Sequence, residues 1–357
     1  MITAQQRSLR PNAPAISRAA VLIVIFMSAA GILLLPFRAH AGAPAQQVIA
    51  PPAYDTASLP SSQCATIPPV SISGQNGSID VPSAFIQQGS ASAAIYNTYA
   101  SQNNLLGSGM TFNNDTVHGA FSYAPLGNLE LSIDTLDSSS TIGSQSLQYS
   151  GDLRIGVKAG LQVLPGLSVA GLGEVLTYSK TGSTGTGGYN GNATSYTLSF
   201  LASYDLQDSA VSFPLIINLR AGYLWDNTGS LLQSDTVHFI PPAGKYAMGV
   251  RGDDQTLIGC SLLFPLPHYY IEPMLEFTAQ FAGAYNSYAV NDSAYSSVSF
   301  DQNPVFLTPG IIFYTPVRGL RVALAASLSL ARSINQASGT APVTPQTVWI
   351  AGLSYSL

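Results

Sequence analysis

Charged side chains are scarce in this chain of 357 residues, because Asp, Glu, Lys and Arg together make up only 9% of it. A typical soluble domain carries about 25%. Hydrophobic residues make up an ordinary 46%, so extra apolar residues do not replace the missing charge. This balance argues against an ordinary soluble domain. The lack of a basic patch argues against binding to nucleic acid.

Long apolar runs are lacking as well, with one exception at the N-terminus over 19–35. A helical membrane protein would need several runs of about 20 apolar residues, so the sequence excludes that class. A charge-poor chain that is rich in Tyr, Ser and Gly and has no helical spans suits a β-barrel that crosses a lipid bilayer.

Cysteine is the third scarcity, since the chain holds only Cys64 and Cys260. An exported protein could join two such residues in a disulfide. Cys260, however, is predicted to lie in the middle of a strand and to face lipid, out of reach of the N-terminal region that holds Cys64. We therefore expect both thiols to be free.

The first 41 residues have the layout of a secretory signal peptide. Three arginines precede the apolar run, and no acidic residue does. Ala39-His40-Ala41 then supplies the small residues of a cleavage site. Cleavage after Ala41 would leave Gly42 as the mature N-terminus. The run is long for a signal peptide, so an uncleaved membrane anchor is the alternative.

Residues 42–88 are rich in Pro, Ser, Gln and Ala and show weak periodicity. This composition predicts a flexible tail, which the export signal would place in the periplasm. A small plug or a partner-binding segment is the alternative for this stretch. The remaining residues, 89–357, are predicted to form the barrel.

Alternation of apolar and polar residues dominates the barrel region. Every odd position from Leu153 to Val163 is apolar, whereas the even positions hold Asp, Arg, Gly, Lys and Gln. Because successive side chains of a strand point to opposite faces, this strand has one apolar and one polar face. The pattern recurs over 195–206 and 320–331. A soluble β-sandwich also alternates, but it usually has shorter strands and more charge on its outer face.

Twelve strands follow from the pattern, in an antiparallel up-and-down barrel, with ten or fourteen left open because the first strand has the weakest pattern. They cover 91–102, 116–125, 128–138, 150–164, 167–180, 193–206, 214–227, 254–265, 268–282, 304–315, 319–332 and 347–357. Five short connections alternate with six long ones, around 103–115, 139–149, 181–192, 228–253, 283–303 and 333–346. Outer-membrane barrels have short periplasmic turns and long extracellular loops, so both termini are predicted to be periplasmic.

Outward aromatic residues sort to the two ends of the predicted strands. Near the periplasmic end we place Tyr123, Tyr204, Phe264, Tyr269, Phe313 and Tyr355. Near the extracellular end we place Tyr196, Trp225, Phe281 and Trp349. Aromatic rings are stable at the level of the lipid headgroups, so two girdles are expected in a membrane barrel.

Two stretches resemble the strand–turn–strand units of OmpA-type outer-membrane barrels, namely FSYAPLGNLEL over 121–131 and GDLRIGVKAGLQVLPGLSVAGLGEVL over 151–176. The resemblance covers 90–357 and implies an all-β transmembrane barrel. The last residues, GLSYSL over 352–357, resemble the C-terminal signal read by the barrel assembly machinery, with Leu357 in place of the usual Phe. No peptidoglycan-binding domain follows the last predicted strand, so tethering to the cell wall is not expected.

Residues suited to catalysis are few. Outer-membrane phospholipases resemble barrels of this kind but need a His and a Ser held together, and the chain contains no His-x-Ser. Asp235 and His238 share one predicted loop and are interpreted as a solvated pair. The Gly-rich run over 182–191 lacks the strand-to-helix setting of a phosphate-binding loop. We expect no enzyme activity, no metal and no cofactor.

The charged residues of the predicted strands fall on the polar face. Charge on the lipid face would be costly, so these residues are placed in the lumen. They are Glu130, Asp134, Asp152, Arg154, Lys158, Glu174, Asp205, Arg220, Asp226, Glu272, Glu276 and Arg321. Arg154 and Lys158 lie on a strand between strands that carry carboxylates, which predicts salt bridges. Glu272 and Glu276 are predicted to form an unpaired acidic patch.

Two functions suit such a barrel. The first is a narrow channel for passive passage of small polar solutes, which needs only a lumen of suitable radius and charge. The second is a structural or surface-interaction barrel with a closed, salt-bridged lumen. Strand number does not decide, because twelve lies between filled eight-strand barrels and open sixteen-strand porins. Outer-membrane lipid and the barrel assembly machinery are the expected partners in both cases.

Overall fold

Twelve long strands dominate the computed structural model, which describes residues 70–105, 109–143, 145–177, 194–208, 213–227, 254–282, 303–330, 333–336, 339–342 and 344–357. They are β1 (Ala91–Asn103), β2 (Thr111–Leu126), β3 (Leu129–Ile142), β4 (Gln145–Leu164), β5 (Leu167–Thr177), β6 (Thr194–Asp205), β7 (Ile216–Trp225), β8 (Gln255–Leu263), β9 (Ile271–Ala282), β10 (Val305–Tyr314), β11 (Leu320–Ser329) and β14 (Thr347–Ser356). Two short strands, β12 (Ser333–Gln336) and β13 (Gly339–Pro342), pair only with each other. A 3-10 turn, η2 (Pro267–Tyr269), links β8 to β9. Within these ranges no helix is long and apolar enough to cross a membrane.

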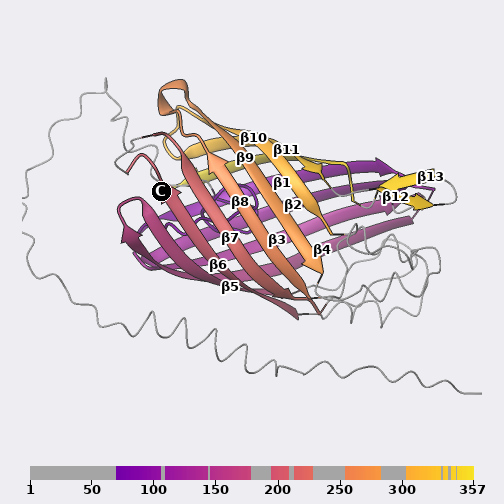
Figure 1. Cartoon of the computed structure of the whole chain (residues 1–357), viewed down its shortest axis with the longest axis horizontal. Coiled ribbons are helices and arrows are strands. Elements are labelled where there is room, and N and C mark those ends of the chain that lie inside the picture. The colour runs from indigo at the N-terminus through magenta and orange to yellow at the C-terminus, as the bar shows by residue number, and fades with distance from the viewer. Residues whose placement is uncertain are drawn as a thin grey trace, which may run out of the picture. The chain divides into compact units, whose positions relative to one another are not determined.

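The long strands close into one antiparallel barrel (Figure 1). Each strand pairs with its neighbours in chain order, and the first strand pairs with the last, from Ser92↔Ser356 to Ala100↔Val348. At this seam the Leu357 N–H donates to the Ala91 carbonyl at 2.8 Å. A closed barrel has no edge strand whose backbone groups would be left unpaired in lipid. The prediction of a twelve-strand up-and-down barrel is confirmed.

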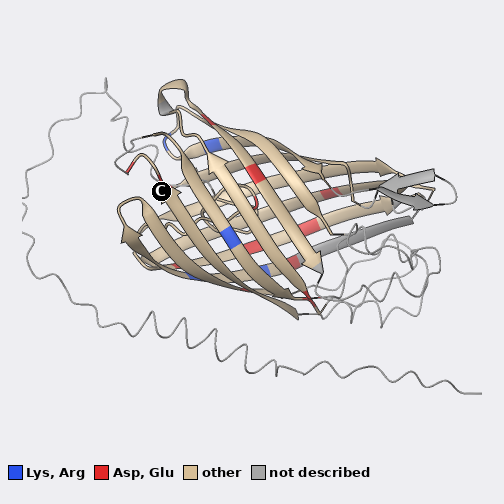
Figure 2. Ribbon diagram, viewed as in Figure 1, with Lys and Arg blue, Asp and Glu red and all other residues tan. Residues whose placement is uncertain are grey.

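The wall has an apolar outer face and a polar inner face. On β1 the side chains of Ala94 and Tyr96 are buried, whereas that of Ile95, between them, is 61% exposed. The same alternation turns Val157 and Phe200 outward. Apolar side chains that cover the outside of a barrel are stable in lipid and not in water, so this wall spans a bilayer. Charged residues interrupt the strands only at scattered positions (Figure 2).

Aromatic side chains are exposed at both ends of the strands. Tyr123, Tyr204, Tyr269 and Tyr355 are exposed at the end where β14 finishes. Tyr196, Phe281 and Trp349 are exposed toward the opposite end. The other three predicted members of the girdles, Trp225, Phe264 and Phe313, are partly buried. This distribution fits rings that lie at two headgroup levels.

The hairpin of β3 and β4 is longer than the sequence predicted. A long loop was expected over 139–149, but β3 continues to Ile142 and β4 begins at Gln145, so that expectation is wrong. Similarly, β2 begins at Thr111, inside the loop expected over 103–115.

Hydroxyl and amide side chains explain why these extensions are stable. Polar residues occur on both faces here, so the regular alternation that marks a membrane strand is absent from the sequence. Asn114 Oδ1 accepts hydrogen bonds from the hydroxyls of Ser138 and Ser140, each at 2.9 Å. Cross-strand bonds of this kind support a ladder that continues beyond the lipid-facing part of the wall.

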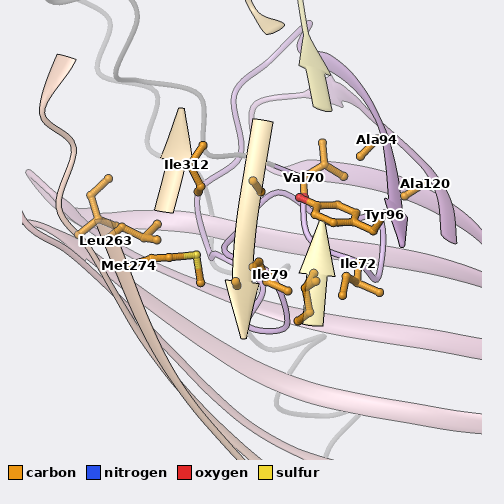
Figure 3. Packing of buried hydrophobic residues seen from close by; sticks show 13 residues of the cluster. Val70, Ile72, Ile79, Ala94, Tyr96, Ala120, Leu263, Met274 and Ile312 are labelled. Atoms are coloured by element: carbon orange, nitrogen blue, oxygen red, sulfur yellow. The ribbon is translucent and has the colours of Figure 1, made fainter. Parts of the chain in front are cut away.

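Residues 70–88, called the lumen segment below, lie inside the barrel (Figures 1 and 3). Every residue over 70–79 and 81–84 is buried. The segment forms no named strand, and its isolated bridges, Val70↔Asn76 and Gly77↔Pro82, join it only to itself. Gly77 permits this compact path, because a Cβ there would lie 2.5 Å from the Val81 carbonyl oxygen.

The lumen segment differs from the flexible periplasmic tail expected over 42–88. Over 70–88 the chain is folded and mostly buried, which corresponds to the alternative of a small plug. Burial of Val70, Ile72 and Ile79 offsets the entropy lost when the segment is ordered. Residues 42–69 and the expected signal peptide over 1–41 lie outside the described residues.

Candidate functional site in the barrel lumen

The inner face carries the charged residues that the sequence placed in the lumen. The structure buries eight of them: Glu130, Asp134, Lys158, Glu174, Asp226, Glu272, Glu276 and Arg321. Four are partly buried: Asp152, Arg154, Asp205 and Arg220. Buried hydroxyl and amide groups from most strands accompany them, including Ser132, Ser199, Gln255 and Thr308. The interior is therefore polar although the outer face is apolar.

Two ion pairs tie neighbouring parts of the wall together. Lys158 Nζ lies 2.9 Å from Glu130 Oε2, and both side chains are fully buried. The register of β3 and β4 places these two residues directly opposite each other. Across β6, Arg220 Nη2 on β7 lies 3.2 Å from Glu174 Oε2 on β5. Buried charges of this kind are stable only when further hydrogen bonds satisfy their remaining atoms.

The lumen segment supplies those further hydrogen bonds to the Lys158–Glu130 pair. The backbone N–H of Asn76 donates to Glu130 Oε1 at 3.1 Å, and its side-chain amide donates to Oε2 at 2.9 Å. Lys158 Nζ donates to the carbonyl oxygens of Ser83 and Phe85, at 3.0 and 3.3 Å. Both members of the pair are thus bound to the segment as well as to each other.

The opposite wall holds the segment through Glu276 on β9. The backbone N–H of Asp80 donates to both carboxylate oxygens of Glu276, at 3.2 and 3.1 Å. Around the closed ring β9 is six strands from β3 in either direction, so Glu130 and Glu276 face each other across the lumen. The segment therefore bridges the barrel from wall to wall.

This contact corrects the predicted acidic patch. Glu276 is fully buried against the lumen segment and accepts two hydrogen bonds from it. Glu272 accepts a hydrogen bond from the Tyr314 hydroxyl, and the guanidinium of Arg321 lies 5.3 Å from the centre of the Tyr314 ring. One of these partners lies in the lumen segment, which the sequence did not place inside the barrel, and the others lie on β10 and β11.

A chain of hydroxyl and amide groups extends the contact along β6, β7 and β8. Ser203 Oγ donates to Asn218 Oδ1 at 2.7 Å, and Asn218 Nδ2 donates to Ser261 Oγ at 3.0 Å. At the other end of this chain the hydroxyls of Ser83 and Ser203 are 3.1 Å apart, and the Ala84 N–H donates to Ser203 at 2.7 Å. The wall thus offers the segment both acceptors and donors.

Apolar side chains complete the set of wall residues that contact the lumen segment, called its seat below (Figure 3). Val70, Ile72 and Ile79 belong to one buried cluster with wall residues that include Tyr96 and Met274. The Tyr96 hydroxyl donates to the Val70 carbonyl. A Cβ on Gly352 would overlap the Tyr96 ring, so a glycine is needed on β14 at this point. These contacts fix the first residues of the segment against the seam of the barrel.

Asp80 is the titratable group of the segment itself and does not belong to a membrane-spanning strand. Burial raises the pKa of its carboxyl above the ordinary value of 3.8. Three wall side chains oppose this rise, namely His118, Arg154 and Arg220. The docked segment therefore holds a proton on Asp80 more tightly than a free segment would.

The sequence contains one indication that the lumen is occupied, which the alternation of apolar and polar residues did not by itself reveal. Several inward positions are apolar although the other inward residues of their strands are mostly polar: Ile216, Leu263, Met274, Ile312 and Ile350. In a lumen filled only with water, these side chains would be costly. Their presence on the inner face indicates that another apolar surface covers them.

Other candidate positions have little to add. Asp235, His238 and the run over 182–191 lie outside the described residues, as does Cys64. Cys260 is a free, partly buried thiol on β8. In the part of the chain that the structure describes, no three His, Cys, Asp or Glu residues gather to hold a metal.

The fold and the lumen together define a membrane-spanning β-barrel with a polar interior. No protein-family model matches the chain, and no curated protein matches it by sequence. Among solved structures it is similar to the NanC porin, with 11% identity and a TM-score of 0.42 over 74% of this chain and 100% of that one.

Two further solved structures are similar over most of the chain. An outer membrane channel from Pseudomonas putida F1 has 9% identity and a TM-score of 0.45 over 76% of this chain and 97% of its own. The CymD monoaromatic hydrocarbon channel has 8% identity and a TM-score of 0.42 over 82% and 98%. Likeness at this level carries no function from those proteins to this chain.

Proposed function

We propose that this protein is a narrow channel for passive passage of small polar solutes across the bacterial outer membrane. The observation that carries the proposal is the contrast between the two faces of the wall. The outer face is apolar, while hydroxyl, amide and charged groups line the inner face on most strands. A lumen with such a lining lets a polar solute cross lipid without losing all of its hydrogen bonds.

The setting of the channel belongs to the same proposal. The barrel is of the OmpA type, is exported by the signal peptide over 1–41, and is inserted through its last strand by the barrel assembly machinery. Both termini lie in the periplasm, and 42–69 forms the remaining tail. The pattern of short and long connections and the residues GLSYSL at 352–357 support this orientation.

Fixed charge on the wall would make the channel prefer cations. Eight of the twelve inward charges are acidic and four are basic. Ion pairs neutralise Lys158 and Arg220 with one carboxylate each, which leaves an acidic excess among the rest. Fixed charge in a narrow passage with low-dielectric walls concentrates counter-ions.

Conductance across planar bilayers tests the channel directly. Full-length protein is expected to carry current, with a reversal potential in a KCl gradient that shows cation preference. The preference should grow at low salt, because charge is screened less there. A preference for anions would remove the wall carboxylates from the mechanism. Absence of current at every voltage would contradict the channel itself.

A closed structural or surface-interaction barrel is the second candidate. One observation favours it, since the lumen segment joins Glu130 to Glu276 across the interior and thereby narrows the passage. In that case the carboxylates serve only to hold the segment in place. The bilayer measurement separates the two candidates, because only a channel carries current.

A further inference from the structure

The lumen segment forms no part of the ladder that closes the wall. Each of the twelve wall strands has two hydrogen-bonded neighbours among the other wall strands. The two bridges within residues 70–88 join the segment only to itself. The barrel would therefore remain closed as a ring if the segment left the lumen.

The segment nevertheless occupies a seat that fits it closely. Two glycines on the wall make room for it, Gly156 on β4 and Gly259 on β8. A Cβ on Gly156 would overlap the side-chain amide of Gln75, and one on Gly259 would lie 2.9 Å from Val81 Cγ2. Together with the carboxylates on opposite walls, these contacts place the segment across the path of any solute.

Water could replace most of the polar contacts that hold the segment. Glu130, Glu276 and Lys158 bind backbone N–H and carbonyl groups of the segment, and Asn76 adds a side-chain amide. Water also solvates all these groups well. Replacing the hydrogen bonds between segment and wall by hydrogen bonds to water therefore has a small net cost in free energy. The apolar cluster around Ile72 and Ile79 is the part that favours the docked state.

A tether with a pivot connects the segment to the wall. Phe85 and Ile86 are partly buried, whereas Gln87, Gln88 and Gly89 are exposed, and β1 begins two residues later. Gly89 adopts a positive φ of 78°, and nothing lies within 4 Å of the position of a Cβ there. Such a glycine can change its backbone angles without steric cost, once its N–H releases the Ala124 carbonyl, which it binds at 2.8 Å.

We propose that the lumen segment is a removable plug, which closes the channel while Glu130 and Glu276 hold it from opposite walls and opens the channel when it leaves its seat. This inference rests on the channel function proposed above and names the part of the chain that regulates it. Withdrawal exposes the Lys158–Glu130 pair and Glu276 to the solute path. The charged residues that line the open channel are thus the same residues that hold the segment in the closed channel.

A disulfide between segment and wall tests the plug. The variant carries Ser83→Cys and Ser203→Cys in full-length protein whose own thiols are replaced by Cys64→Ser and Cys260→Ser. The two native hydroxyls are 3.1 Å apart, so the thiols can bond across the same contact. The oxidised variant should conduct at least about tenfold less than the reduced form, and reduction should restore the current.

A matched control carries Ser168→Cys with the same Ser203→Cys change. Ser168 and Ser203 are partners on β5 and β6, so this pair joins wall to wall and leaves the segment free. Its conductance should not depend on oxidation. A second lock, Val81→Cys with Gly259→Cys, fixes the segment to β8 and should act like the first. Migration of unboiled and boiled protein in a denaturing gel identifies the variants that have folded.

The outcomes separate the plug from the channel. If locked and reduced forms of a folded variant conduct equally, solutes pass beside a fixed segment, and the plug is refuted while the channel stands. If none of the folded proteins conducts in either redox state, the channel itself fails and the plug fails with it.

Discussion

The wall and the lumen segment are parts of one chain, but different forces hold them. In the wall, backbone ladders run around a closed ring, so each strand is fixed by many similar bonds to two neighbours. The segment has no ladder to the wall and depends on individual contacts with residues such as Glu130, Ser203 and Glu276. A single substitution should therefore disturb the seat of the segment more easily than it disturbs the topology of the barrel.

The largest effect is expected where the two regions share a buried charge. Lys158→Met leaves Glu130 buried without its cation and removes the donor to Ser83 and Phe85. Loss of one member of a buried ion pair costs about 3–5 kcal/mol in free energy of unfolding. Urea unfolding in detergent, followed by fluorescence of Trp225 and Trp349, measures the change. The double variant Lys158→Met with Glu130→Gln should recover part of the loss, and an equal loss in both would contradict the pairing.

A charge on the outer face should disturb the wall and leave the seat of the segment unchanged. Val157 faces outward at 47% exposure, beside Leu131 on β3 and Gly173 on β5. Val157→Arg should cost about 2–4 kcal/mol in barrel stability, because the side chain would enter lipid. Unfolding from lipid vesicles measures this cost. Gln87→Arg, at an exposed position near the tether, is the control and should change stability by less than about 0.5 kcal/mol. Equal effects would mean that the outer face does not lie in lipid.

A methyl group at the seat should displace the segment and leave the ladder intact. In Gly259→Ala the new Cβ would lie 2.9 Å from Val81 Cγ2, so the segment must shift. Overpacking of this kind costs about 1–3 kcal/mol. In a variant free of native cysteines, modification of Ser73→Cys by a small thiol reagent should become about 5- to 100-fold faster. Gly171→Ala on β5 is the control, since nothing lies within 4 Å of its added Cβ. A rate that rises equally in both would show that the segment is not seated against β8.

The smallest effect is a dependence of docking on pH. The raised pKa of Asp80 means that the docked segment binds a proton more tightly than the released one. Protonation of Asp80 thus stabilises the docked state in full below pH 3.8, the ordinary pKa. This contribution is lost as the pH rises through the raised pKa. The rate of Ser73→Cys modification should increase with pH over that window.

Two variants isolate the contribution of Asp80. Glu276, His118, Arg154 and Arg220 also face this carboxyl. Asp80→Asn should flatten the pH profile, whereas His118→Gln should leave a slope. A profile that survives Asp80→Asn unchanged would assign the dependence to another group.

The wall was predictable from the sequence because its physics is periodic. A lipid-facing strand must alternate apolar and polar residues, and each of the twelve wall strands shows that pattern in the sequence. The predicted bounds of the strands differ from the observed ones by a few residues. The extensions at Thr111 and Gln145 were missed because strands beyond the lipid no longer need an apolar face. The pairing of Lys158 with Glu130 was within reach, since neighbouring strands and matching positions predict it.

The seat of the segment was not predictable in the same way. Residues 70–88 have no period, so composition alone suggested a tail. Glu130 and Glu276 each accept a hydrogen bond from a backbone N–H of the segment, and backbone groups leave no trace in residue type. Only the inward apolar residues, such as Met274 and Ile312, carried information about the seat. They were passed over because they do not fit the rule that inward residues are polar. Contacts between segments that are far apart in the chain depend on three-dimensional closure, which no local pattern encodes.

The seam between β1 and β14 links closure of the barrel to docking of the segment. The Tyr96 ring, which holds Val70 through its hydroxyl, lies against Gly352 on β14, the strand that closes the ring. One side of the seat therefore does not exist until β14 has paired with β1. We therefore expect the ring to seal and the segment to dock in the same late step. A membrane that receives such a barrel would then meet a ring that is sealed and filled at the same moment, with no stage at which the lumen stands empty.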